Sequence, residues 1–273
     1  MLEQLKYINH LGETLEFGEN NLFVNENDLR NFAWEITSKN DRISGFKKGI
    51  VSKTIPIVLK CESDEEGVML KNKLFETFEK DVLAVKHGRI IIGDYYLKCF
   101  VTESAKSNYL IHKNYLKISV KITTDFPYWI KETMSTFNYG GLVDGCDLDF
   151  NREFPFDYTS NLRGKQLNNE HFVAANFRIN IYGICENPSV NIGGHLYEVE
   201  ASVGNNEYLT IDSVNKTIVL TKIDGTQVNF FNKRNRDSYI FEKMPPGVSN
   251  VSANGIFKFD IILLEERGEP KWI

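Results

Sequence analysis

The sequence has few of the residue patterns that mark metal sites or catalytic centres. The four cysteines are far apart and form no C-x-x-C pair, whereas a zinc site uses at least one close pair of ligands. The five histidines are also scattered, and none lies at metal-ligand spacing from another. We therefore expect no metal, no cofactor and no catalytic residue. We expect buried, reduced thiols at Cys61, Cys99, Cys146 and Cys185.

Motifs for nucleophilic catalysis and phosphate binding are missing as well. The sequence contains no G-x-S-x-G elbow, and no G-x-G-x-x-G or P-loop follows a strand-like segment. Pairs of carboxylates could support glycoside hydrolysis, but such pairs arise by chance among 37 acidic residues. The segment from Asp144 to Asn151 is rich in oxygen ligands, yet it lacks the glycine and the closing glutamate of a calcium loop. We interpret it as a solvated connection between domains.

Long hydrophobic runs and strong net charge are absent too. The most apolar runs, residues 90–92 and 261–264, are far too short to span a bilayer. The first residues lack the charged and then apolar pattern of a signal peptide. A net charge of −5 and a pI near 5.7 give no electrostatic footprint for nucleic acid or an anionic membrane. We expect synthesis in a cytoplasm and no membrane insertion.

What the sequence does have is the composition of a folded protein and one clear helix. Hydrophobic residues make up 42% and charged residues 25%, and 273 residues can form two domains. Ser63 and Glu66 fit a capping box at the start of a helix. Behind it, Leu70, Leu74, Phe78 and Val82 recur every four residues with Phe75 alongside, which predicts an amphipathic helix of about four turns.

The rest of the first half predicts antiparallel strands. Gly93 and Asp94 fit a tight turn between residues 90–92 and 95–97. Apolar and polar residues alternate from Leu116 to Thr123, as in a strand with one buried face. The segment between Val101 and Leu116 is polar at its start and apolar at its end, and we expect it to form a long hairpin arm.

The second half shows no helical periodicity. Short strand-like segments, such as 176–182, 196–201, 208–212, 217–222 and 226–231, are separated by Gly, Asn and Pro, which predicts a β-sandwich or jelly roll. Asp224-Gly225 is a strong signal for a type I′ hairpin turn. We place the domain break between residues 133 and 141, with an N-terminal domain of residues 1–135 and a C-terminal domain of residues 136–273.

The order of these features resembles the distal tail protein (Dit) family of long-tailed siphophages and prophages. In the first half, strands, one capped helix and a long hairpin precede an aromatic-proline segment at residues 124–130. In the second half, the matching segments are 208–212, 215–220, 246–250 and the ending at 267–273. The resemblance implies a mainly β fold, with a sandwich-like N-terminal domain that carries one helix and a hairpin arm. It also implies a galectin-like C-terminal β-sandwich.

The resemblance further implies a structural role in the virion and no enzymatic activity. N-terminal domains would form a homo-hexameric ring at the tail tip, between the tail tube protein above and the tail-tip protein below. The chain is too short for a large sugar-binding insertion. The alternative is a carbohydrate-binding module for host-surface glycans, because the 19 Phe, 12 Tyr and 3 Trp could supply sugar platforms as well as cores and interfaces.

We expect the ring interface to include the predicted arm. Thr102 to Asn108 is polar, whereas Tyr109, Leu110, Ile111 and Tyr115 are apolar and close together. A hairpin tip has little core of its own, so these side chains would be exposed on a monomer and would mark a partner surface. The other interpretation is that the tip folds back on its own sheet.

Overall fold

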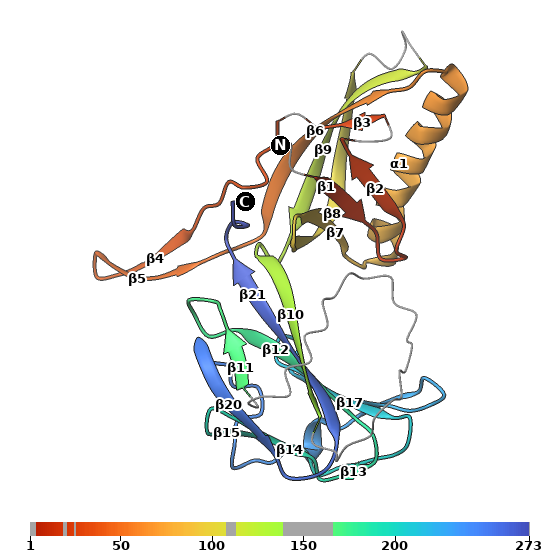
Figure 1. Cartoon of the computed structure of the whole chain (residues 1–273). Coiled ribbons are helices and arrows are strands. Elements are labelled where there is room, and N and C mark those ends of the chain that lie inside the picture. The colour runs from red at the N-terminus through yellow and green to blue at the C-terminus, as the bar shows by residue number, and fades with distance from the viewer. Residues whose placement is uncertain (1–3, 19–20, 25, 108–112, 139–165, 273) are drawn as a thin grey trace. The chain divides into compact units, whose positions relative to one another are not determined.

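A computed structural model describes residues 4–18, 21–24, 26–107, 113–138 and 166–272 of the chain (Figure 1). The chain divides into two compact units, one of Met1–Lys131 with Glu266–Ile273 and one of Glu132–Glu265. The segment from Glu266 onward thus belongs to the first unit. The predicted division into domains 1–135 and 136–273 stays a prediction.

The first unit is built on a run of antiparallel strands. Their order is β2-β1-β7-β8-β9-β6-β3, and each neighbouring pair is antiparallel. The strands are β1 (Leu5–Ile8), β2 (Thr14–Phe17), β3 (Leu22–Phe23), β6 (Val51–Lys60), β7 (Gly88–Ile92), β8 (Tyr95–Ser107) and β9 (Tyr115–Thr124). The start of β10 (Trp129–Asn138) joins β8 through the pairing of Ile130 with Tyr96.

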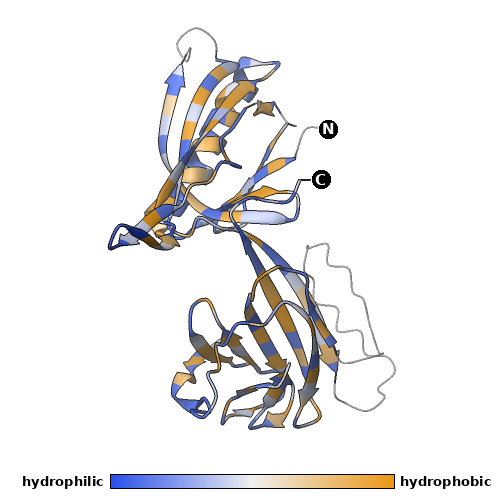
Figure 2. Ribbon diagram, turned by 90° about the vertical axis from the view of Figure 1, so that its left-hand side faces the viewer, coloured by the Kyte–Doolittle hydropathy of each residue, from blue (hydrophilic) through white to orange (hydrophobic). Residues whose placement is uncertain are grey.

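The alternation predicted for residues 116–123 is confirmed by β9, in which Leu116, Ile118, Val120 and Ile122 are buried. Figure 2 shows hydrophobic and hydrophilic residues alternating along the strands. The predicted tight turn is also present, because Ile92 pairs with Tyr95 and leaves a two-residue loop with Gly93 at φ 55°.

The predicted helix is α1 (Asp64–Ala84), which is longer than the four turns we expected. The Ser63 side chain caps it by accepting a hydrogen bond from the Glu66 amide at 3.1 Å. Its buried face differs from the predicted stripe. Leu74 and Phe78 are buried, but Val82 and Phe75 are exposed, and Asp81 is buried in their place.

The second unit is a β-sandwich. One sheet has the order β10-β21-β12-β17-β18-β19, another has the order β11-β20-β14-β15, and β13 pairs with β16. The strands are β11 (Gln166–Asn169), β12 (Asn176–Tyr182), β13 (Cys185–Glu186), β14 (Ser189–Ile192), β15 (His195–Glu198), β16 (Ser202–Val203), β17 (Tyr208–Asp212), β18 (Thr217–Thr221), β19 (Gln227–Asn229), β20 (Gly247–Ala253) and β21 (Lys258–Arg267). A short 3-10 helix, Phe231–Lys233, follows β19.

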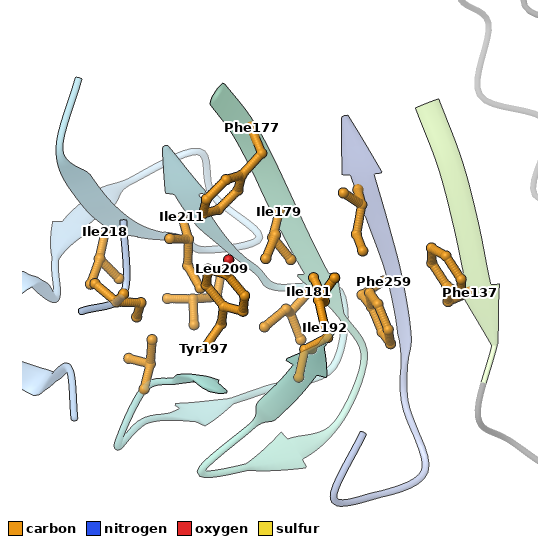
Figure 3. Close-up of a cluster of buried hydrophobic side chains, with 14 of the residues drawn as sticks. Phe137, Phe177, Ile179, Ile181, Ile192, Tyr197, Leu209, Ile211, Ile218 and Phe259 are labelled. Atoms are coloured by element: carbon orange, nitrogen blue, oxygen red, sulfur yellow. The ribbon is translucent and has the colours of Figure 1, made fainter. Parts of the chain in front are cut away.

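Side chains from both sheets form the core of the sandwich (Figure 3). Ile179, Ile211 and Ile218 come from the larger sheet, while Ile192 and Tyr197 come from the smaller one, and all are buried. As predicted, the described part of the second half, residues 166–272, contains no long helix.

One turn prediction is wrong in its type. Asp224-Gly225 does lie in a hairpin, but Thr221 pairs with Gln227, so the loop has five residues. The Lys222 amide donates to the Thr226 carbonyl and the Gly225 amide donates to the Lys222 carbonyl. Gly225 has a positive φ and Asp224 does not, whereas a type I′ turn requires positive φ at both central residues. The loop is instead a type I turn followed by a glycine with positive φ.

Candidate interaction surfaces

A second hairpin, which the sequence analysis missed, is the most exposed element of the first unit. It consists of β4 (Glu35–Lys39) and β5 (Arg42–Lys47), and within the described chain these strands pair only with each other. All but one of their residues are exposed. Figure 1 shows this hairpin projecting away from β6. An isolated two-stranded hairpin is marginally stable in water, so it gains from packing against a partner.

One face of this hairpin is apolar. Ile36 pairs directly with Phe46, and they are 62% and 60% exposed. The register shifts by one residue near Thr37, so Ile43 pairs with Ser38 and shares the face of Ile36. Ile43 is 61% exposed. We call this surface, formed by Ile36, Ile43 and Phe46, the hairpin face.

Two local features define the course of the hairpin. At its tip, Asn40 and Asp41 both have positive φ between the paired residues Lys39 and Arg42, as in a type I′ turn. The other face is polar, and it includes an ion pair between Lys47 and Glu35 at 3.3 Å. A sequence signal existed in this Asn-Asp pair, but the register shift hides the alternation of the apolar residues.

The base of the hairpin is fixed by a lysine among aromatic rings. The Lys48 ammonium lies 4.8 Å from the Trp34 ring centroid and 4.3 Å from that of Tyr128. It also donates a hydrogen bond to the Pro127 carbonyl at 3.1 Å. Burial lowers the pKa of Lys48, and the nearby charge of Lys53 adds to the effect. The cation–π contacts tie both ends of the hairpin to the loop before β10.

The predicted arm between Val101 and Leu116 is partly described. β8 and β9 pair as far as Ser107 with Lys117, and Tyr115 is half-buried at the start of β9. The other three predicted interface residues, Tyr109, Leu110 and Ile111, lie outside the described residues. The arm hypothesis therefore stays a prediction.

His10 belongs to a hydrogen-bond network around the buried Asp81. His10 Nδ1 lies 2.6 Å from an Asp81 carboxylate oxygen, and the Tyr7 hydroxyl donates to the other oxygen at 2.6 Å. Burial raises the pKa of Tyr7, and its hydrogen bond to Asp81 adds to the effect. A Cβ at Gly88 would overlap both Asp81 and Tyr7. This network joins β1, α1 and β7.

One pair could suggest a nucleophile and its base. Ser238 Oγ lies 3.2 Å from His195 Nε2, but it donates to the Leu196 carbonyl at 2.6 Å. Within the described chain, no carboxylate forms a hydrogen bond or ion pair with His195, so the third member of a triad is not among those residues.

The thiols that the structure describes are poor nucleophiles. Cys61, Cys99 and Cys185 are buried and unbridged. Burial raises the pKa of Cys99 to about 12 and that of Cys185 to about 11. A thiol with so high a pKa is almost fully protonated near neutral pH, and the thiolate is the reactive form.

The described residues contain neither a cluster that could hold a metal ion nor a helix that could cross a membrane. No three of the His, Cys, Asp and Glu residues there lie close enough together to hold a metal ion. The Asp144 to Asn151 cluster and Cys146 lie outside the described residues. No described helix is both long and apolar enough to cross a membrane.

The fold is similar to those of solved proteins from phage adsorption apparatus and baseplates. The chain is similar to the Dit protein of phage SPP1, described as a paradigm of hub adsorption apparatus in Gram-positive-infecting phages. That match has 9% identity and a TM-score of 0.60, and it covers 97% of this chain and 99% of the other. Chains of the phage P2 baseplate in its activated conformation, with Ca and with Sr, match at 13% and 12% identity with a TM-score of 0.64. Each of these covers 99% of this chain and 100% of the other.

The resemblance to the distal tail protein family is thereby confirmed at the level of the fold. The similarity covers both units, because almost the whole of each chain is aligned. No family model matches the sequence, and no curated protein matches it either. Identities this low show a common fold.

Proposed function

We propose that the chain is a structural hub protein of a phage or prophage tail tip, without enzymatic activity. The observation that carries the proposal is the near-full-length match in fold to SPP1 Dit and to phage P2 baseplate chains. By analogy, six copies form a ring through their first units, with galectin-like second units outside. The ring joins the tail tube protein to the tail-tip protein, so the mature location is the virion.

The exposed hairpin supports a role in assembly. A closed ring needs two different surfaces on each subunit, one of which meets the other on the next copy. The hairpin face offers apolar residues that the described part of the chain leaves mostly exposed. A large side chain buried at an interface contributes on the order of 1.5–3 kcal/mol, and a ring repeats that gain at every joint.

Two variants separate the contributions of the two candidate arms. One carries Ile36→Ser and Phe46→Ser on the hairpin face, and the other carries Tyr109→Ser, Leu110→Ser and Ile111→Ser on the predicted arm. We expect light scattering to shift from hexamer to monomer for the first variant, while circular dichroism stays unchanged.

The variant with serine at residues 109, 110 and 111 tests the predicted arm. A shift to monomers would support the arm, an intact hexamer would reject it, and unfolding would assign the three residues to the subunit core. The matched control is Ile223→Ser, since Ile223 is 74% exposed in the Asp224-Gly225 loop of the second unit. The control should leave the hexamer intact.

A second candidate function is glycan binding by the second unit. On β12 and β17, the rings of Tyr182 and Tyr208 lie 6.1 Å apart, beside a hydrogen bond from Thr210 to Asn180. Aromatic faces next to amide and hydroxyl groups suit the alternating apolar and polar surfaces of sugars. Binding to host cell-wall glycans that is lost with Tyr208→Ala would support this function. Absence of binding by the wild-type ring would reject it.

A further inference from the structure

The segment of residues 268–272 belongs to the first unit and packs on the loop that precedes the β4–β5 hairpin. The Arg30 guanidinium lies 3.8 Å from the Trp272 ring centroid and donates a hydrogen bond to the Pro270 carbonyl at 2.7 Å. It also lies 3.6 Å from a Glu269 carboxylate oxygen. Arg30 thus contacts a ring, a backbone carbonyl and a carboxylate of this segment. We call residues 268–272 the clasp.

The clasp also contacts the segment that follows the hairpin. Gly268 packs so closely that a Cβ there would lie 3.1 Å from Lys48 Nζ and 3.7 Å from the Phe32 ring. A glycine allows the backbone this approach because it has no side chain to displace those groups. Phe32 lies between Arg30 and β4, and Lys48 directly follows β5. The clasp therefore holds both chain segments at the base of the hairpin.

The direction of the hairpin depends on contacts at its base. Within the described chain, β4 and β5 pair only with each other. The loop before them is anchored to β6, because the buried Lys53 donates a hydrogen bond to the Asp28 carbonyl at 3.1 Å. Between this anchor and β4 lie Arg30 and Phe32, which the clasp contacts. The clasp and the aromatic contacts of Lys48 therefore determine where the hairpin points.

The contacts of the clasp can break without unfolding of the subunit. Trp272 is 73% exposed, and the Glu269 side chain is 30% exposed. A cation–π contact and an ion pair near the surface are weak compared with the burial of apolar side chains in a core. The clasp can therefore open and close while the strands of the first unit stay folded.

We propose that the clasp is a conformational device that holds the β4–β5 hairpin in the direction needed for subunit association. When the clasp is closed, the hairpin face is presented to the neighbouring copy. When it is open, the hairpin moves and association weakens. The control of association rests on the proposed ring, whereas the effect on the hairpin concerns a single chain. Two measurements on the full-length protein therefore test the two effects separately.

Hydrogen exchange at a concentration where the chain is monomeric tests the clasp itself. Leu29 and Asn31 donate backbone hydrogen bonds within the loop. Trp272→Ala removes the ring over Arg30, and we expect these two amides to exchange about tenfold faster. Trp272→Phe keeps an aromatic ring there and should exchange like the wild type. The matched control is Ile256→Ala, since Ile256 is 77% exposed in the second unit. Equal exchange in the wild type and in Trp272→Ala would overturn the proposal.

Sedimentation of the same variants over a concentration series tests the control of association. Trp272→Ala should weaken association about fivefold, because the fraction of chains with a correctly directed hairpin falls. Trp272→Phe and Ile256→Ala should match the wild type. Weaker association with unchanged exchange would assign Trp272 to the interface itself and overturn the clasp. Faster exchange with unchanged association would overturn the control of assembly. A wild-type chain that stays monomeric at every concentration rejects the ring, and its exchange still decides whether the clasp holds the hairpin loop.

Discussion

Two pairs of apolar residues occupy equivalent positions in two hairpins but have opposite surroundings. On β17 and β18, Ile211 pairs with Ile218, and both are fully buried in the sandwich core. On β4 and β5, Ile36 pairs with Phe46, and both are mostly exposed. Pairing across strands is the same in each case, so the difference lies in what covers the face. The first pair stabilises the subunit, and we propose that the second stabilises contacts between subunits.

The largest effect on subunit stability should come from the buried pair. Replacing Ile211 with Ala removes methyl groups from a packed core and leaves a cavity, so we expect the free energy of unfolding to fall by about 2–5 kcal/mol. Urea denaturation followed by circular dichroism measures the loss. A change below 0.5 kcal/mol would mean that this region is loosely packed, and the contrast with the exposed pair would disappear.

A smaller loss should follow from crowding the buried polar network of the first unit. In Gly88→Ala the new Cβ overlaps the Asp81 carboxylate and the Tyr7 hydroxyl. Because overpacking forces such groups apart, we expect unfolding to require about 1–3 kcal/mol less free energy. Gly255→Ala is the comparison variant for glycine replacement, since a Cβ there meets only Phe257 at ordinary van der Waals distance. Equal losses in both variants would show that crowding at residue 88 has no special cost.

The smallest effect on subunit stability should come from the exposed pair. In Ile36→Ser with Phe46→Ser, no described core contact is lost, so we expect the unfolding free energy of the monomer to change by about 0.5 kcal/mol or less. Denaturation at a concentration where the protein is monomeric isolates this value. A loss as large as that of Ile211→Ala would place the two residues in the subunit core and contradict the comparison.

Much of the fold could be predicted because its strands alternate regularly. β12 and β17 match their predicted ranges, and the helix begins at its predicted cap. The apolar face predicted for the helix was wrong at Val82 for a geometric reason. Four-residue steps drift about 40° each on a helix, so Val82 lies roughly 120° from Leu70. Asp81 takes the buried position because Tyr7, 74 residues away, donates a hydrogen bond to it, and no local pattern reveals such a partner.

The candidate interface was harder to predict than the fold. The sequence favours Tyr109, Leu110 and Ile111 because they form a continuous apolar run. On the β4–β5 hairpin, the apolar residues 36, 43 and 46 do not alternate, because the shifted register brings Ile43 to the face of Phe46. Exposure depends on which strands pair and which remain alone, and that information is tertiary.

The central claim is that this chain assembles through its first unit, and the mass in solution tests it most directly. Light scattering on the wild-type protein across a concentration series should give about 188 kDa, six times the 31.4 kDa of one chain. Under the same conditions, the variant with serine at residues 36 and 46 should give a mass near that of one chain. A wild-type mass of one chain at every concentration, or a hexamer that the variant leaves unchanged, would contradict the account.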